Sequence, residues 1–187
     1  MGTFSDVSGT VAADQSGVGT ITFTSVANAL LSDDVRSTAV LLLGESSHYL
    51  AVTGFRFAIP ADATVLGITV DVERSTTVAT SITDNSLRLL KAGVPAGDNK
   101  ASGAQWPTSD AYASYGSASD LWGTTWTPAE VNASDFGVGI SAVAGVAATA
   151  QIDHVKVSVT YAGGSRTGNA RRRLRAGGGM STVERAL

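Results

Sequence analysis

The chain contains no cysteine, and it has no stretch with the periodicity of a long helix. Without cysteine, a disulfide framework and thiolate metal sites are both excluded. No window of eleven or more residues keeps a helical period, so we expect no substantial helix.

Long apolar runs are also missing. The longest strongly apolar run covers residues 39–43, which is far too short to cross a bilayer. The first fifteen residues have neither a basic start nor an apolar stretch, so we expect no secretory signal and synthesis in the cytoplasm. We therefore expect no membrane partner.

What the sequence does contain is glycine, small residues and β-branched residues in alternating patterns. The chain has 21 glycines, and this composition suits strands joined by tight turns better than helices. Several segments alternate in the manner of half-buried strands. The alternating apolar sets are Leu66, Ile68, Val70 and Val72; Leu87 and Leu89; Phe136, Val138 and Ile140; and Val155, Val157, Val159 and Tyr161.

We expect about eight strands in all. They are the segments above, an early strand around Ile21 and Phe23, and further strands at 38–43 and 49–58. The pattern predicts an all-β protein, an antiparallel β-sandwich of jelly-roll type. We expect residues 1–161 to form this domain, with a long excursion at 92–134, and residues 162–187 to form an extended C-terminal tail rich in Gly and Arg.

The excursion holds all three tryptophans, two of them in SDLWGTTWTP (119–128). A structureless loop of this length is rare in a compact domain, so the segment must contain short strands, fold over the sandwich or carry a function. Thr127, Pro128 and Glu130 predict a helix start of one or two turns. One interpretation is that Trp122 and Trp126 pack this excursion onto the sandwich. The alternative is that one of them, with Tyr112 or Tyr115, forms an exposed platform for sugars.

Groups for catalysis or metal binding are scattered. We read His48 and His154 as surface or turn histidines, since neither has an adjacent nucleophile motif. Asp33 and Asp34 fit turn chemistry, and Asp84 with Asn85 is a weak calcium pattern. Asp153 falls in the inward phase of its strand and is interpreted as a structural clamp on a turn or bulge. We expect no catalytic residue, no cofactor and no metal site.

Charge is divided unevenly along the chain. Residues 1–161 carry 7 Lys/Arg and 15 Asp/Glu, a net charge of −8, whereas residues 162–187 carry 6 Arg and one Glu, a net charge of +5. The tail could dock on an acidic protein surface or stay solvated. A nucleic-acid partner is not expected, because no aromatic side chain is interleaved to stack bases. The docking candidates are Arg166, Arg171, Arg172, Arg173 and Arg175.

Three stretches of the chain together resemble a β-sandwich module of the virion proteins of tailed bacteriophages. They are FRFAIPADATVLGITVDVER, SDLWGTTWTPAEVNASDFGVGISA and AQIDHVKVSVTY. The resemblance covers roughly residues 38–161. It implies a non-enzymatic structural protein of the virion, either a capsid decoration or a tail component. Such a protein would assemble as a homo-oligomer and contact other virion proteins. The alternative is a carbohydrate-binding adhesin module on a fibre or spike, with surface glycans as ligands.

Overall fold

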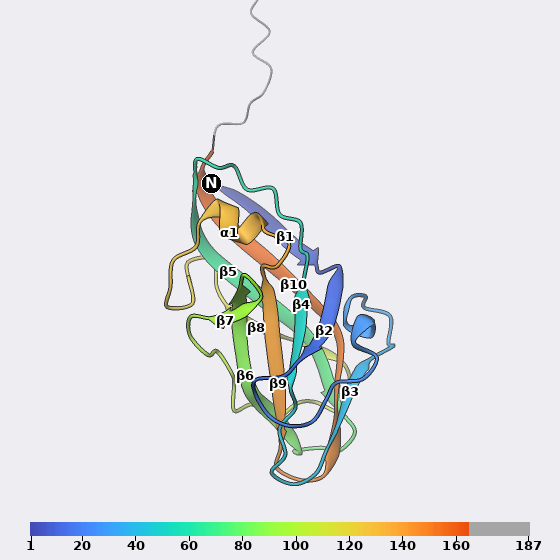
Figure 1. Ribbon diagram of the computed structural model, residues 1–187. Helices are drawn as coiled ribbons and strands as arrows, with labels where there is room; N and C mark the ends of the chain where they lie inside the picture. The colour runs from blue at the N-terminus through green and yellow to red at the C-terminus, as the bar shows by residue number, and fades with distance from the viewer. Residues whose placement is uncertain (165–187) are drawn as a thin grey trace, which may run out of the picture.

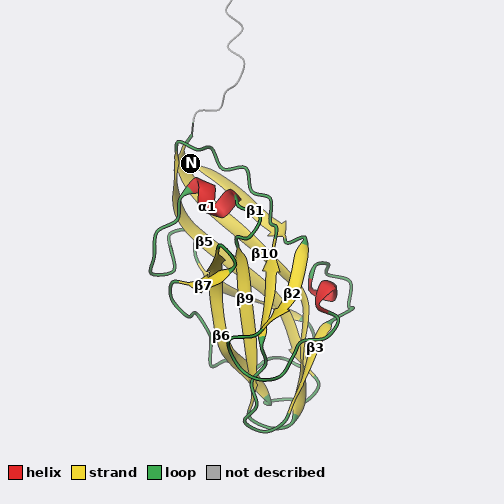
Figure 2. Cartoon of the chain, viewed as in Figure 1, coloured by secondary structure: helices red, strands yellow, loops and turns green. Residues whose placement is uncertain are grey.

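Two antiparallel sheets pack face to face in the computed structural model, which describes residues 1–164 (Figures 1 and 2). The predicted β-sandwich is therefore confirmed, with ten strands within residues 1–164 where the sequence indicated about eight. The first sheet contains β1 (Gly2–Ser8), β3 (Ser37–Leu41), β5 (Ala63–Thr76), β8 (Ala111–Gly116) and β10 (Ala148–Gly163). The second contains β2 (Val11–Gln15), β4 (Tyr49–Thr53), β6 (Ile82–Lys91), β7 (Val94–Ala96) and β9 (Gly137–Ala144).

The strand order is that of a jelly roll. The first sheet has the order β1-β10-β5-β8, with β3 also pairing with β10, and the second has the order β2-β4-β9-β6-β7. From β3 onward each connection crosses between the sheets, except for the hairpin of β6 and β7. This winding places the long strands β5 and β10 side by side in the middle of the first sheet.

Alternating apolar side chains fill the space between the sheets. Val155, Val157 and Val159 of β10 are fully buried, as the alternation predicted. Elsewhere β-bulges change the phase of a strand. A register shift between the pairs Val159–Ile68 and Tyr161–Val65 turns Val65 into the core, so Leu66 is only partly buried and its predicted inward position is wrong.

The N-terminal segment differs most from the expectation. Residues 2–8 and 11–15 form β1 and β2, which the sequence did not indicate. Ile21 forms only an isolated bridge, with Ser47, and the segment around Phe23 leads into the 3-10 helix η1 (Val26–Ala29) instead of a strand. Within residues 1–164 there is no helix with the length and apolar character to span a membrane.

The excursion at 92–134 contains β7, β8 and the short helix α1 (Pro128–Asn132). The helix begins as predicted, with a capping box: Thr127 accepts a hydrogen bond from the backbone N–H of Glu130, and the Glu130 carboxylate accepts one from the backbone N–H of Thr127. These short elements bring the aromatic residues of the excursion onto the sandwich.

Candidate functional site

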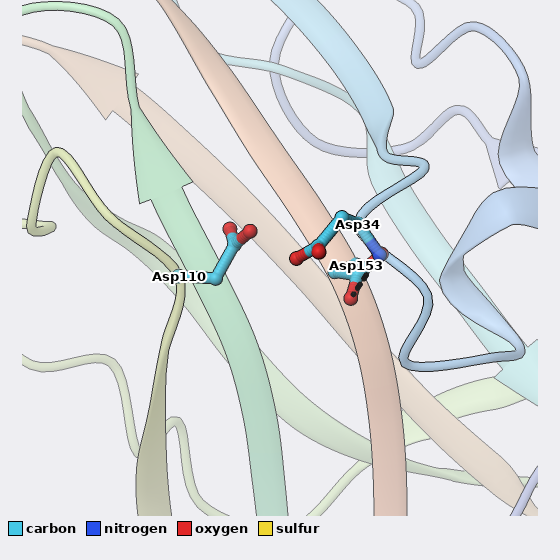
Figure 3. Close-up of side chains that lie close together, drawn as sticks. All are labelled: Asp34, Asp110 and Asp153. Carbon is cyan, nitrogen blue, oxygen red and sulfur yellow. Dashed lines mark hydrogen bonds between the residues drawn. The ribbon is translucent and has the colours of Figure 1, made fainter.

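Three aspartates meet beside the central strand β10 of the first sheet, and each comes from a different element (Figure 3). Asp34 lies in the loop before β3, Asp110 directly precedes β8, and Asp153 lies in β10. One carboxylate oxygen of each residue lies within 4.8 Å of the others. The sequence predicted separate roles for Asp34, in a turn, and Asp153, in a strand, and did not single out Asp110. The three are far apart along the chain and are brought together by the pairing of β5 with β8 and β10.

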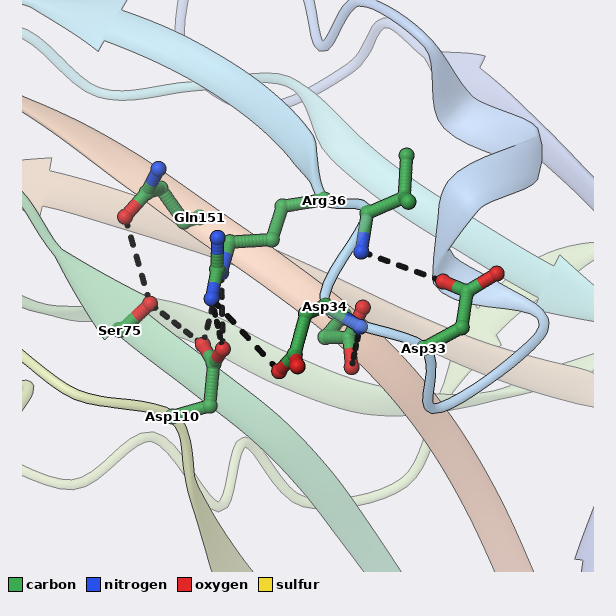
Figure 4. A network of polar contacts seen from close by, with 8 residues as sticks. Asp33, Asp34, Arg36, Ser75, Asp110 and Gln151 are labelled. Carbon is green, nitrogen blue, oxygen red and sulfur yellow. Dashed lines mark hydrogen bonds and ion pairs between the residues drawn. The ribbon is translucent and has the colours of Figure 1, made fainter.

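Arg36 links two members of this acidic cluster (Figure 4). Its guanidinium binds both carboxylate oxygens of Asp110, with its Nε 2.8 Å from Oδ2, and it lies 3.8 Å from Oδ1 of Asp34. Asp110 also accepts a hydrogen bond of 2.6 Å from the Ser75 hydroxyl. The hydrogen bonds from Arg36 and from Ser75 lower the pKa of the Asp110 carboxyl, although its burial acts in the opposite direction.

Asp153 is the most deeply buried member, with 1% of the residue exposed. It occupies a bulge of β10, since Ile152 pairs with Arg74 while His154 pairs with the next residue, Glu73. Its Oδ2 accepts a hydrogen bond of 3.3 Å from the backbone N–H of Asp34, which fits the predicted clamp on a bulge, but its Oδ1 has no hydrogen-bond partner. Burial raises the pKa of Asp153, and the negative charge of Glu73 adds to this effect.

Asp33 lies beside the cluster and acts in a turn. Its Oδ1 accepts a hydrogen bond of 3.2 Å from the backbone N–H of Val35, two residues on. This contact fits the turn chemistry expected of the Asp33–Asp34 pair. Asp34 has a second role, because its φ of 64° directs the loop so that its carboxylate reaches the cluster.

The tryptophan side chains are in the core. Trp122 is fully buried and its indole N–H donates a hydrogen bond of 2.9 Å to the carbonyl of Ile68, while Trp126 packs edge-on against Phe136. Tyr115 is also buried. Of the four residues considered for a sugar platform, Tyr112 alone is exposed, at 43%. The ammonium group of Lys156 lies 4.5 Å from the centre of the Tyr112 ring, so Lys156 covers one face of that ring.

A buried ion pair joins the two sheets and was not anticipated from the sequence. Arg74 of β5 contacts Asp84 of β6, and both side chains are almost fully buried. Asp84 also accepts hydrogen bonds from the Trp106 indole and the Tyr115 hydroxyl, at 2.8 and 2.9 Å. Asp84 thus has four donors, the fourth being the backbone N–H of Ser102, so it has a structural role and not that of a calcium ligand.

The two histidines have different surroundings. His48 lies 2.7 Å from the Asp14 carboxylate. His154 is 8% exposed, so its assignment to the surface is wrong: the bulge at Asp153 and the neighbouring β1 cover it. Its ring nitrogens lie 2.8 Å from the hydroxyls of Ser8 and Tyr112, and burial lowers its pKa. A serine–histidine contact is present, but a tyrosine takes the place of the orienting carboxylate of a triad.

The predicted docking residues of the tail, from Arg166 to Arg175, lie outside the described residues. Strand β10 ends at the same end of the molecule as the N-terminus (Figure 1).

No family model matches this chain. No match was found among curated proteins either. Among solved structures, the enzymatically active domain of tailspike protein 4 of bacteriophage CBA120 is similar over 80% of this chain, with 11% sequence identity and a TM-score of 0.37. This chain spans only 19% of that domain. The N-terminal cellulose-binding domain of a Cellulomonas fimi β-1,4-glucanase C is similar over 83% of this chain and 88% of its own length, with 10% identity and a TM-score of 0.30. Likenesses this distant add nothing on function.

Proposed function

We propose that this chain is a non-enzymatic structural protein of a tailed-phage virion, a capsid decoration or tail component that reinforces the particle through contacts between subunits. The sequence resemblance over residues 38–161 suggests the class of protein. The observation that carries the mechanical role is a group of exposed apolar side chains at one end of the sandwich.

This group, the apolar tip, consists of Leu42 and Leu43 after β3 and Val146 between β9 and β10, with Val40 beside them on β3. Their exposed fractions are 61%, 73%, 47% and 68%. The two connections are held together by backbone hydrogen bonds between Gly44 and Ala144 and between Ala144 and Glu45, of 2.8 and 3.0 Å. Apolar side chains gathered on an exposed end are typical of an interaction surface.

A second copy of the chain fits this surface best. The tip lies at the end of the molecule opposite the N-terminus and the C-terminal end of β10 (Figure 1). The two ends therefore differ, and contacts between unlike ends build rings or extended arrays. Such arrays suit a decoration or tail protein, in which each copy is held by its neighbours.

The test is the oligomeric state of the purified full chain. Light scattering should show an oligomer for the wild type, and the double variant Leu42→Ser and Leu43→Ser should shift it to monomer. The matched control is Val94→Ser, which removes an equally exposed apolar side chain from β7 on the other sheet. A wild-type chain that stays monomeric at high concentration, and is not incorporated into phage particles, would contradict the proposal.

A carbohydrate-binding module is the second candidate, and the observation that favours it is the exposed ring of Tyr112. A glycan array with the wild type and a Tyr112→Ala variant separates the two functions. A structural protein should give no sugar-dependent signal, whereas an adhesin should give a signal that the substitution removes.

A further inference from the structure

Most edge strands of the two sheets are protected from pairing with another chain. An exposed edge offers unpaired N–H and C=O groups, and proteins normally block it with charge, proline, a bulge or a covering segment. Strand β1 has a register shift, and β7 is three residues long and contains Pro95. The segment before η1 covers β2, where the backbone N–H of Phe23 donates a hydrogen bond to Asp14. The same segment covers the start of β3, where Thr24 forms a bridge with Thr38.

Strand β8 has none of these barriers. It ends the first sheet, where it pairs with β5 on one side, and no strand within residues 1–164 pairs with its other side. Its six residues, AYASYG, include no charge and no proline, and its register with β5 continues without a shift. Tyr112, Ser114 and Gly116 are exposed. This edge is therefore open to a further strand.

The backbone groups of Tyr112 and Ser114 point away from β5. In an antiparallel pair, alternate residues direct their N–H and C=O groups to opposite sides. Ile68 of β5 directs its N–H to the side of β8, because this group donates a hydrogen bond of 3.0 Å to the carbonyl of Asp120, which follows β8. The residues of β5 in phase with Ile68 lie opposite the odd-numbered residues of β8. The even-numbered residues, Tyr112 and Ser114 among them, therefore face the open side.

The side chains on the exposed face of β8 leave this edge accessible. The Tyr112 hydroxyl lies 2.8 Å from Nδ1 of His154 in β10, and the Ser114 hydroxyl donates a hydrogen bond to Asp71 in β5. Both side chains thus point back over their own sheet. A strand that approaches the edge meets the backbone of β8 and not a bulky or charged side chain.

We propose that β8 pairs in antiparallel fashion with β8 of a second copy, about a two-fold axis at Ser114, so that the first sheets of two copies become one. This inference rests on the proposed function, because it says how copies of the structural protein meet. An uncharged strand can face its own copy without opposing like charges. Asp110, which directly precedes β8, is already paired with Arg36.

This pairing adds to the contacts at the apolar tip and does not replace them. Six residues from each copy bury far less than the roughly 1,200 Å² of a stable interface. Contacts at the tip bring a second β8 close and raise its effective concentration. A two-fold contact between copies that are already joined end to end would then link two rings or two chains side by side.

A single introduced cysteine can report the pairing, because the chain has none of its own. Facing Cα atoms in an antiparallel pair lie about 4.5–5.5 Å apart, a distance that a disulfide spans. The full chain with Ser114→Cys should therefore form a disulfide-linked dimer under mild oxidation, seen on a non-reducing gel. The matched control is Val94→Cys on β7, at the edge of the second sheet, which should not cross-link. Adding Leu42→Ser and Leu43→Ser to Ser114→Cys should remove most of the cross-link.

A proline at the same position separates backbone pairing from side-chain effects. Ser114→Pro removes an N–H that faces the open side and leaves the ladder with β5 intact, as edge strands allow. It should raise the concentration at which the oligomer dissociates about tenfold, measured by light scattering over a dilution series. Ser114→Ala loses only the hydroxyl contact with Asp71 and should leave dissociation unchanged. The melting temperature of each variant shows whether its domain is folded, and the cross-link decides the question even if Ser114→Pro fails to fold.

The outcomes separate this inference from the proposed function. An oligomer that persists in light scattering while Ser114→Cys gives no dimer would overturn the inference and leave the structural role standing. A wild-type chain that stays monomeric, with no cross-link from Ser114→Cys at high concentration, would overturn both. Cross-linking of Val94→Cys as strong as that of Ser114→Cys, equal effects of proline and alanine at position 114, or a cross-link to a different virion protein would overturn the inference alone.

Discussion

Some side chains at the centre of the sandwich are charged, and the alternation of apolar residues in the sequence did not predict them. Arg74 and Asp84 are charged residues in apolar strands, yet both point into the core and meet there. The guanidinium of Arg74 also lies 5.0 and 5.6 Å from the ring centres of Trp106 and Tyr115. The aromatic residues of the excursion thus surround a buried ion pair, and burial raises the pKa of the Tyr115 hydroxyl.

Removing one partner of this ion pair should be far more harmful than replacing both. Asp84→Leu should lower the free energy of unfolding by about 3–5 kcal/mol, because it leaves the Arg74 charge buried and unpaired. The double variant Arg74→Met and Asp84→Leu should cost less than the sum of the single changes. Denaturant titration of the four proteins in a double-mutant cycle measures this coupling, and strict additivity would show that the ion pair has no cooperative role.

At the same scale, Trp122 illustrates what the sequence could not show. The residue adopts a left-handed backbone conformation, with φ of 59°, and Gly123 follows with φ of 67°. This left-handed backbone conformation favours glycine at position 123, and a Cβ there would also displace the Asp98 carboxylate. The sequence indicated that Trp122 packs the excursion onto the sandwich, but not its left-handed backbone conformation or the hydrogen bond from its indole N–H to the Ile68 carbonyl.

Among the elements, those defined by local chemistry were predictable and those defined by pairing were not. The start of α1 follows from Thr127, Pro128 and Glu130 alone, and β10 follows from its alternating valines. No residue of β1 or β2 is fully buried and few of their side chains are large and apolar, so the sequence gives them little alternation. They form because β10 and β4 provide edges to pair with. The bulge at Asp153 depends likewise on the register with β5.

The capping box gives a prediction for an element. Thr127→Ala removes the acceptor for the backbone N–H of Glu130, so it should destabilise the domain by about 1 kcal/mol. Thr127→Ser keeps the hydroxyl and should cost less. Chemical denaturation of the two variants measures the difference. Equal destabilisation would indicate that the threonine methyl group, and not the cap, is what matters at this position.

For the whole molecule, the acidic cluster could be anticipated only in part. Asp153 was recognised from its inward phase, and Asp33 and Asp34 from their turn. Asp110 and Arg36 carried no local signal, since their contact joins residues 74 positions apart. The same holds for the apolar tip, which brings the β3–β4 and β9–β10 connections together at one end of the jelly roll.

The separation of charge along the chain leads to a prediction about assembly. Residues 1–161 have a net charge of −8 and residues 162–187 a net charge of +5, so we expect the tail of one copy to be attracted to the body of another. Strand β10 pairs with β5 up to Gly163, and a chain truncated after Gly164 keeps every described pair. Its melting temperature should match that of the full chain, while its incorporation into particles should fall.

The nature of that attraction can be tested by changing the tail without shortening it. Replacing Arg171, Arg172, Arg173 and Arg175 with glutamine removes four positive charges and should weaken incorporation as the truncation does. Replacement with lysine keeps the charge but loses bidentate contacts to carboxylates. If the lysine variant assembles normally and added salt weakens assembly, long-range charge dominates. Normal assembly by the glutamine variant would instead show that the arginines do not hold the subunits together.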